Sequence, residues 1–252
     1  MKLSLCITTY NRFELLKESY AQVVDDPRIS EIIIVDDCST EPGIKEKVNS
    51  LAGGKVKVYH QAQNRGMSRN KADAISYASC PWCIIFDSDN VIGKNYLDAF
   101  YSLFIDGDLD KGMWNTIAPI EKFIFCPDFA KPEFDYRDFK IGNNGNGART
   151  GIYNALFSAI EIKNDSFNCL LNTCNYIVNR DFYLKTYQYN PDHIASDTIW
   201  HAFNHLKAGG LFCVVPNMQY YHRIHKGSGF LQGVDHNMRM QAEVRKMIMD
   251  LK

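Results

Sequence analysis

The sequence predicts an α/β fold built on a doubly wound, mostly parallel β-sheet. Between residues 3 and 104, short apolar runs alternate with stretches whose apolar residues recur at helical spacing. One run, Ile32-Ile33-Ile34-Val35, is apolar throughout, as expected for a strand that is covered on both faces. When strands alternate with helices in this way, the strands pair in parallel, because each helix returns the chain to the same end of the sheet.

The expected elements of this half follow one another through short turns. The second helix, for example, is stopped by Gly53-Gly54, a pair that breaks helices and favours a turn. The expected strands cover residues 3–7, 32–35, 56–59 and 83–86, and the expected helices cover residues 13–24, 44–51, 67–78 and 95–104.

The second half of the sequence is less regular. Residues 123–139 mix aromatic residues with prolines, and residues 142–147 form a loop rich in Gly and Asn, which predicts an insertion or a lid rather than a second domain. Regular structure is expected to resume with a strand at 176–178, a helix at 197–207, a strand at 211–215 and an amphipathic tail helix at 237–251.

The composition excludes several classes of protein. The 252 residues carry 28 Lys and Arg against 29 Asp and Glu, so no excess of positive charge favours nucleic-acid binding. The apolar runs are far shorter than the roughly 20 residues of a transmembrane helix, and no signal-peptide cleavage site follows the first of them. We therefore expect a cytoplasmic protein without a transmembrane segment, in which the eight cysteines, including the Cys80-Pro81-Trp82-Cys83 pair, are mostly buried and structural.

Polar residues follow three of the expected strands. Residues 8–12 follow the first strand, Asp36-Asp37 the second and Asp87-Ser88-Asp89 the fourth. In open α/β sheets, ligands bind beyond the carboxyl ends of the strands. The sequence therefore predicts one cleft that these polar groups share.

Asp87-Ser88-Asp89 is the sharpest local signal in the chain. Two carboxylates at a strand end can hold Mg²⁺ or Mn²⁺ against a diphosphate, because hard divalent ions prefer oxygen ligands and share them with phosphates. The alternative is a turn in which the aspartates bond to nearby backbone groups.

In combination, these segments resemble the nucleotide-sugar domain of the family 2 glycosyltransferases. The resemblance implies a GT-A fold, in which a Rossmann-like, mostly parallel sheet flanked by helices forms a single domain. It divides the chain into a nucleotide-sugar-binding half at 1–110, an acceptor-side half with a flap at 111–235 and a C-terminal helix at 236–252. The segments that carry it are Leu5–Arg12, Ile34–Thr40, Asn64–Ala72, Phe86–Asn90, 174–180 and 196–209, whereas 113–170 match no motif.

The resemblance also implies roles for individual residues. Asp89 would ligate a divalent cation, Mn²⁺ or Mg²⁺, and Asp37 would accept a hydrogen bond from uracil, which favours a UDP-sugar donor. Asp197 stands at the position of the catalytic base, although Ser196 replaces the acidic residue that usually precedes it. Contacts with the nucleotide sugar are implied for Thr8, Tyr10, Arg12, Arg69, Asp87 and Ser88.

A second cluster, Tyr220 to Lys226, resembles a flap that closes over the diphosphate. The resemblance places a metal-binding histidine here, and motif position favours His222 over His225. Arg223 and Lys226 would hold the diphosphate electrostatically. Glycines that follow the cluster would let it move.

Two other features leave alternatives open. The aromatic residues between Phe123 and Phe139 could form a platform for the acceptor, but the core of a small subdomain is the favoured interpretation. The tail helix combines methionines with basic residues, which makes it a candidate for peripheral membrane contact or for packing against the domain.

Together, the motifs and the resemblance predict an enzyme. The resemblance implies an inverting, metal-dependent glycosyltransferase that moves a sugar from a UDP-sugar to a hydroxyl group of a carbohydrate or glycolipid acceptor. The alternative is an inactive UDP-sugar-binding module on the same fold, because Asp197 lacks its acidic neighbour. A nucleotidyltransferase is disfavoured, since Thr9-Tyr10-Asn11-Arg12 has no glycine of the kind that phosphate-binding loops use.

Overall fold

The computed structural model describes residues 1–105, 108–109, 118–131, 134–135, 152–153, 159, 175–193, 196–223, 225 and 233–251. The strands in these residues are β1 (Leu3–Thr9), β2 (Ile29–Asp36), β3 (Val56–His60), β4 (Trp82–Asp87), β5 (Val91–Ile92), β6 (Phe104–Ile105), β7 (Asp108–Leu109), β8 (Phe123–Lys131), β9 (Phe134–Asp135), β10 (Ile152–Tyr153), β11 (Tyr176–Asn179) and β12 (Leu211–Tyr221). The helices are α1 (Phe13–Ser19), α2 (Ile44–Asn49), α3 (Met67–Tyr77), α4 (Lys94–Tyr101), α7 (Arg180–Thr186), α8 (Asp197–Lys207) and α9 (Val234–Met249), with 3₁₀ turns η1 (Ile120–Lys122) and η3 (Pro191–His193).

The described strands other than the β6–β7 hairpin form one mixed sheet, with the order β10-β12-β8-β11-β4-β1-β2-β3 and with β5 and β9 attached to β12 and β8. Strands β3, β2, β1 and β4 pair in parallel, as the sequence predicts. Strand β11 is antiparallel to both β4 and β8, whereas β8 and β12 are parallel to each other. The described residues therefore confirm a single α/β domain with a mostly parallel sheet.

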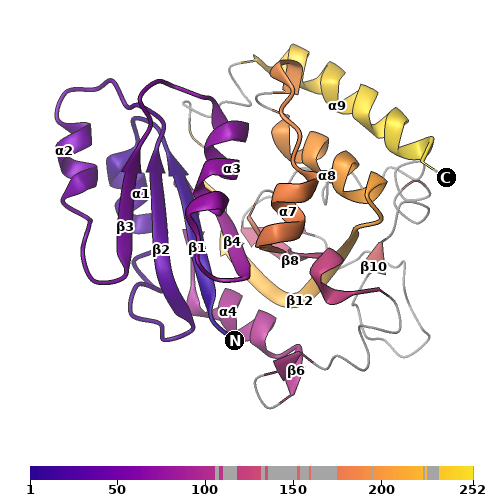
Figure 1. Ribbon diagram of the computed structural model, residues 1–252, viewed down its shortest axis with the longest axis horizontal. Coiled ribbons are helices and arrows are strands. Elements are labelled where there is room, and N and C mark those ends of the chain that lie inside the picture. The colour runs from indigo at the N-terminus through magenta and orange to yellow at the C-terminus, as the bar shows by residue number, and fades with distance from the viewer. Residues whose placement is uncertain are drawn as a thin grey trace.

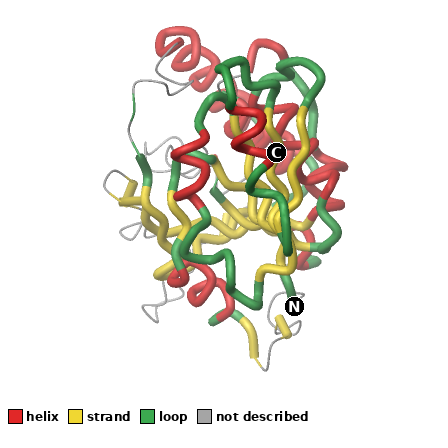
Figure 2. Tube along the Cα trace, turned by 90° about the vertical axis from the view of Figure 1, so that its left-hand side faces the viewer, coloured by secondary structure: helices red, strands yellow, loops and turns green. Residues whose placement is uncertain are grey.

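Helices cover both faces of the sheet (Figure 1). One face packs against α1, α2 and α4, through buried residues such as Leu16, Val48 and Phe100. The other packs against α3, α7, α8 and α9, through residues such as Ile75 and Ile199. Figure 2 shows the strands grouped together with helices on either side of them. Burial on both faces explains why β2 and β4 are almost continuously apolar.

Some element boundaries differ from those that the sequence predicts. Helix α1 ends at Ser19 rather than residue 24, and the Ser19 hydroxyl donates to the Leu16 carbonyl at 2.7 Å. Tyr20 and Val23 are still buried, so the helical spacing of apolar residues correctly predicted burial but not where the helix ends. Strand β12 continues to Tyr221 rather than ending at residue 215. The register of its pairing with β8 shifts between Val215 and Gln219, and this bend lets the pairing resume beyond it.

The aromatic segment belongs in part to the core. Phe123 and Phe125 lie on β8 and are fully buried, which agrees with the favoured interpretation, and Phe129 is partly buried. Tyr136, Phe139 and the loop at 142–147 lie outside the described residues, as does the side chain of Phe134.

The tail helix α9 packs against α8, with Val244 and Ile248 buried, while Met238 is half exposed. This packing supports the second of the two interpretations of the tail. Within the part of the chain that the structure describes, no helix combines the length and apolarity needed to cross a bilayer. Five cysteines are buried, Cys38 is partly exposed, and Cys169 and Cys174 lie outside the described residues; the buried ones are Cys6, Cys80, Cys83, Cys126 and Cys213.

A buried carboxylate fixes the end of the sheet opposite the candidate site. Glu31 on β2 accepts hydrogen bonds from the Ser4 hydroxyl at 2.7 Å and from the Ser79 amide and hydroxyl at 2.6 and 2.7 Å. The ammonium group of Lys57 lies 2.6 Å from its other oxygen. Burial opposes ionisation of Glu31, but these bonds outweigh burial and lower its pKa from 4.5 to about 2.

Glu31→Gln should therefore destabilise the fold by about 2–3 kcal/mol at pH 7. The pKa of Glu31 is lowered in the folded state, so its stabilising contribution is complete above about pH 4.5 and is lost as the pH falls towards 2. Urea unfolding at a series of pH values would measure this. A difference between wild type and variant that stays constant from pH 7 to pH 3 would contradict the assignment.

Candidate active site

The parallel register brings the predicted strand ends together. Thr8 on β1 pairs with Asp87 on β4, and Thr9 on β1 pairs with Asp36 on β2. The backbone amide of Asp37 donates to the Thr9 carbonyl at 2.9 Å, so the chain after β2 stays bonded to the end of β1. The polar groups expected to share a cleft therefore lie at one edge of the sheet.

Asp37 joins the end of β2 to the start of α3. Its carboxylate oxygens accept hydrogen bonds from the backbone amides of Arg65 and Gly66, at 2.7 and 2.9 Å. Gly66 has a φ of 81°, a conformation that favours glycine, and it directly precedes α3. Burial raises the pKa of Asp37 while the two amides oppose the rise. A carboxylate has about four acceptor sites, so Asp37 retains the capacity to accept from a ligand.

Asn11 connects the turn after β1 to the turn after β2. Its backbone nitrogen donates to the Ser39 hydroxyl at 2.8 Å, and its side-chain oxygen accepts from the backbone amides of Thr40 and Glu41 at 2.9 and 3.1 Å. Its φ of 51° is left-handed, a conformation that Asn tolerates better than most residues. Tyr10, the preceding residue, is exposed, so a fixed turn presents its ring at the surface.

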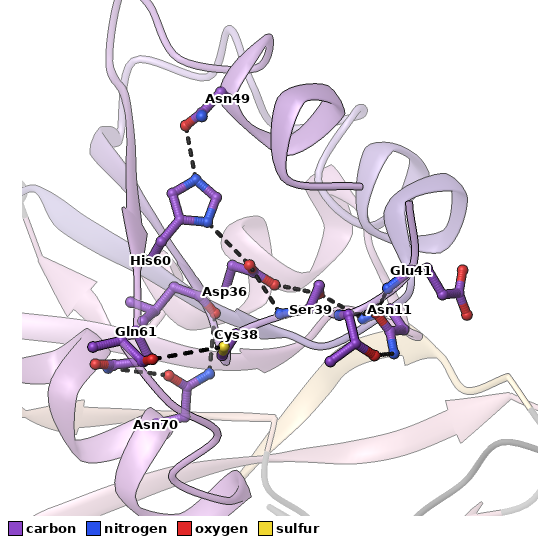
Figure 3. A network of polar contacts seen from close by, with 12 residues as sticks. Asn11, Asp36, Cys38, Ser39, Glu41, Asn49, His60, Gln61 and Asn70 are labelled. Atoms are coloured by element: carbon purple, nitrogen blue, oxygen red, sulfur yellow. Dashed lines mark hydrogen bonds and ion pairs between the residues drawn. The ribbon is translucent and has the colours of Figure 1, made fainter. Parts of the chain in front are cut away.

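Asp36 lies between His60 and Ser39 in the same network (Figure 3). Its carboxylate accepts a short hydrogen bond from the Ser39 hydroxyl and contacts His60 Nδ1 at 3.0 Å. His60 in turn contacts the Asn49 side chain at 2.7 Å. Asp36 is 1% exposed, so its role in this structure is to hold the turn rather than to meet a ligand.

Asp89, the proposed metal ligand, has two partners from distant segments. Its Oδ2 lies 2.8 Å from the guanidinium of Arg12 and 2.8 Å from Nε2 of His225. The neighbouring Asn90 side chain accepts from the amide of Arg223 at 3.2 Å. The described residues of the segment after β12 therefore lie against the turn after β4.

The two histidines of this segment lie differently. His225 contacts Asp89, whereas the ring of His222 lies edge-on to the ring of Tyr220, with centroids 6.4 Å apart. The Arg223 guanidinium forms an ion pair with Glu18 on α1. Lys226 lies outside the described residues.

Asp197 is the first residue of α8, and only 11% of its side chain is exposed. Lys71 Nζ on α3 lies 3.0 Å from Asp197 Oδ2 and 3.5 Å from Asp87 Oδ1. Burial raises the pKa of Asp197, Lys71 opposes that rise, and the charge of Asp87 adds to it. The candidate base and the first aspartate of the Asp-Ser-Asp turn are thus linked through a buried lysine.

Sequence reasoning did not single out Lys71. A signal was present, because Lys71 follows Ser68 by three positions and precedes Ile75 by four, and both of those residues are buried. Residues at these spacings share a helix face, so a lysine there is expected to be buried and paired.

Ser196 and Arg69 take positions that the motifs alone do not reveal. The hydroxyl of buried Ser196 lies 3.0 Å from Nδ1 of His193. The guanidinium of Arg69 lies over the ring of Tyr189, 3.6 Å from its centroid. Ser88 is buried, within the turn whose two aspartates are described above.

The donor set suits a hard divalent cation. Asp89 Oδ2 and His225 Nε2 face each other. Carboxylate oxygen and imidazole nitrogen are both ligands that Mn²⁺ accepts. In the described part of the chain no cluster of three or more Asp, Glu, His or Cys side chains could hold a metal. One or two protein ligands are nevertheless what Mg²⁺ and Mn²⁺ commonly use when substrate phosphates supply further oxygens. The residues present therefore fit such an ion.

Comparison with known proteins shows what the chain resembles. The family model for glycosyl transferase family 2 matches residues 4–113, which contain β1 to β4 and the Asp-Ser-Asp turn. This part of the chain therefore resembles glycosyl transferase family 2. The chain is 30% identical over 116 residues to the abequosyltransferase RfbV of Salmonella typhimurium strain LT2, a match that covers 44% of this chain and 34% of that protein. It is 30% identical over 97 residues to the glycosyltransferase GlyG of Streptococcus pneumoniae serotype 4, covering 38% of this chain and 30% of that protein.

Solved structures extend the likeness to the whole fold. GalNAc-T7 crystallised with UDP, GalNAc and Mn²⁺ matches 90% of this chain and 44% of its own, with a TM-score of 0.64 and 15% identity. Staphylococcus aureus TarS 1–349 in complex with UDP matches 98% of this chain and 64% of its own, with a TM-score of 0.56 and 18% identity. At these identities the likeness establishes the fold, which is GT-A. The chain spans about a third of the length of the curated relatives it matches.

Asn11→Ala should lower the free energy of unfolding by about 2–3 kcal/mol, because it removes side-chain hydrogen bonds and places alanine in the left-handed region. Asn11→Gly is the matched control. It loses the same bonds without the conformational cost, so its loss should be about 1 kcal/mol smaller. Urea unfolding measures both, and equal losses would contradict the conformational part of the argument.

Proposed function

We propose that the chain is a metal-dependent glycosyltransferase that moves a sugar from a UDP-sugar to an acceptor hydroxyl, with inversion, in glycan or glycolipid synthesis. The observation that carries the proposal is the position of Asp197. The Asp197 carboxylate, at the start of α8, is largely buried and contacts Lys71, which also contacts Asp87 at the end of β4. Strand β4 lies in the region that the family 2 model matches. In this proposal, a base for the acceptor and a binding edge for the donor lie close together.

The donor half of the proposed site is the edge formed by the turns after β1, β2 and β4. Asp37 would accept a hydrogen bond from the uracil, and Thr8 and Tyr10 would lie beside the base and ribose. The bonds of Asn11 and Asp36 support this assignment, since a turn that is already ordered loses little entropy when it binds a ligand. Arg69, Asp87 and Ser88 complete the proposed donor contacts.

A divalent cation, Mn²⁺ or Mg²⁺, would be held by Asp89 together with a histidine, and it would take up negative charge on the leaving diphosphate. The 2.8 Å contact with Asp89 favours His225 for this role, in place of the His222 that motif position favours. Arg12 now contacts the same carboxylate oxygen, and we propose that it turns to the diphosphate when the donor binds. Arg223 and Lys226 would add positive charge from the flap.

In the proposed reaction, the acceptor oxygen attacks the anomeric carbon from the face opposite the diphosphate. The bond between that carbon and the diphosphate oxygen breaks, and UDP leaves with the electron pair. Asp197 accepts the proton of the acceptor hydroxyl, which requires that Asp197 be ionised before the attack. The division at residues 1–110, 111–235 and 236–252 remains part of this proposal, with the acceptor on the side of the second segment.

An inactive UDP-sugar-binding module is the second candidate. The observation that favours it is Ser196, whose hydroxyl meets His193 where the family usually has an acidic residue beside the base. Binding of UDP without release of UDP from any UDP-sugar, across a panel of acceptors, would support this candidate over the first.

Asp197→Asn should reduce kcat about 10²- to 10⁴-fold, because the amide cannot accept the proton. The affinity for UDP should stay within about threefold, since the proposal assigns Asp197 to the acceptor and not to the nucleotide. Coupled UDP release and titration calorimetry measure the two quantities. Asp192→Asn, an exposed carboxylate in η3, is the matched control. If the kcat of Asp197→Asn lies within tenfold of the wild-type value, the assignment of Asp197 as the base is wrong.

His225→Ala should raise the Mn²⁺ concentration for half-maximal UDP release at least tenfold, on the order of what loss of a metal-site interaction costs. His222→Ala, three residues earlier, is its matched control and should change that concentration less than about threefold. The reverse result would assign the metal to His222, and no effect in either variant would place the metal elsewhere.

A further inference from the structure

Lys71 is a buried lysine at the point where α3, β4 and α8 meet. Only 6% of its side chain is exposed, and its ammonium lies 3.0 Å from Asp197 Oδ2 and 3.5 Å from Asp87 Oδ1. A buried ammonium is costly unless it is paired, so this position depends on the two carboxylates. The contact with Asp197 joins residues 126 positions apart in the sequence.

We infer that Lys71 is the positioning residue for the catalytic base: it orients the Asp197 carboxylate and keeps it ionised beside Asp87. This inference rests on the proposed function. A lysine that holds one carboxylate oxygen fixes the plane of the group and therefore the direction in which it accepts a proton. It acts through Asp197 and need not touch the donor or the acceptor.

The charges around Asp197 support this role. Burial is the largest effect that raises its pKa, and the charge of Asp87 raises it further, so both favour the protonated and inactive form. Lys71 is the larger of the opposing influences, ahead of a hydrogen bond from the Thr198 amide. Without Lys71, burial would favour the protonated form of Asp197.

The other titratable groups near this pair do not replace Lys71. Tyr187, which follows α7, faces Asp197, and burial raises its pKa, so it stays neutral at physiological pH. His201, one turn along α8, faces Lys71. Burial, with the charges of His205 and Lys71, holds the pKa of His201 well below its ordinary value, so it is also neutral.

Ser196 explains why a lysine suits this particular site. Where an acidic pair is usual, this chain has Asp197 alone at the start of α8, and the neighbouring hydroxyl is turned to His193. The base therefore lacks an acidic neighbour at the preceding position. Its ionisation depends instead on the ammonium that approaches from α3.

The test compares Lys71→Met, which removes the charge, with Lys71→Arg, which keeps it. Lys57→Met is the matched control, because Lys57 also pairs with a buried carboxylate, Glu31, but at the opposite end of the sheet. The quantity measured is kcat for UDP release at saturating UDP-sugar and acceptor, as a function of pH. In such a profile, the acidic limb is the range in which kcat falls as the pH is lowered. The pH of this limb does not depend on how much of each variant folds.

Lys71→Met should lower kcat about 100-fold at neutral pH and move the acidic limb about one pH unit or more towards higher pH, because the base then ionises later. Lys71→Arg should keep the limb of the wild type. Lys57→Met should leave both the limb and kcat unchanged. An acidic limb in Lys71→Met that coincides with that of the wild type would overturn the inference.

A second readout separates this inference from the proposed function. Carboxyl ¹³C NMR of Asp197, assigned with Asp197→Asn, should show a higher pKa in Lys71→Met than in the wild type. An unchanged pKa would overturn the inference whether or not the protein turns over. A wild type that releases no UDP from any UDP-sugar, yet shows the raised pKa in the variant, would count against the proposed function and support the pairing.

Discussion

The parallel pairing of β1 with β2 and β4 is the constraint on which the site depends. It makes the turns after these strands meet at one edge, and those turns carry the carboxylates of Asp37, Asp87 and Asp89. Negative charges crowded into a partly buried edge are unfavourable unless donors or cations meet them. Much of the surrounding structure supplies those partners.

The partners come from segments that are far apart in the sequence. Backbone amides before α3 satisfy Asp37, Arg12 and His225 meet Asp89, and Lys71 meets Asp87. The same lysine reaches the start of α8, which belongs to the second half of the chain. The ion pairs of Lys71 therefore link the proposed base on α8 to the end of β4, on the proposed donor side.

Much of the fold could be predicted from the sequence, because its first half follows simple patterns. Apolar runs such as Ile32 to Val35 could only be strands buried on both faces, and their order implied the parallel sheet. The end of α1 could not be predicted, because Tyr20 and Val23 keep helical spacing while the backbone has already left the helix. The bend that extends β12 depends on pairing with β8, a contact between distant segments that local pattern does not encode.

The candidate site shows the same division. Asp37, Asp87 and Asp89 are candidates because acidic residues follow expected strands, and Asp197 is a candidate because of the resemblance to family 2 glycosyltransferases. Lys71 was not predicted, since its importance lies in two partners at positions 87 and 197. The choice between His222 and His225 likewise depends on how the chain turns after β12, and only the contact of His225 with Asp89 distinguishes them.

A crystal structure of the protein with UDP and Mn²⁺, phased to locate manganese by its anomalous signal, tests the central claim most directly. The account predicts a manganese peak bound by Asp89 and His225, with the diphosphate beside it and the uracil against Asp37. Manganese or UDP bound away from the ends of β1, β2 and β4 would contradict it.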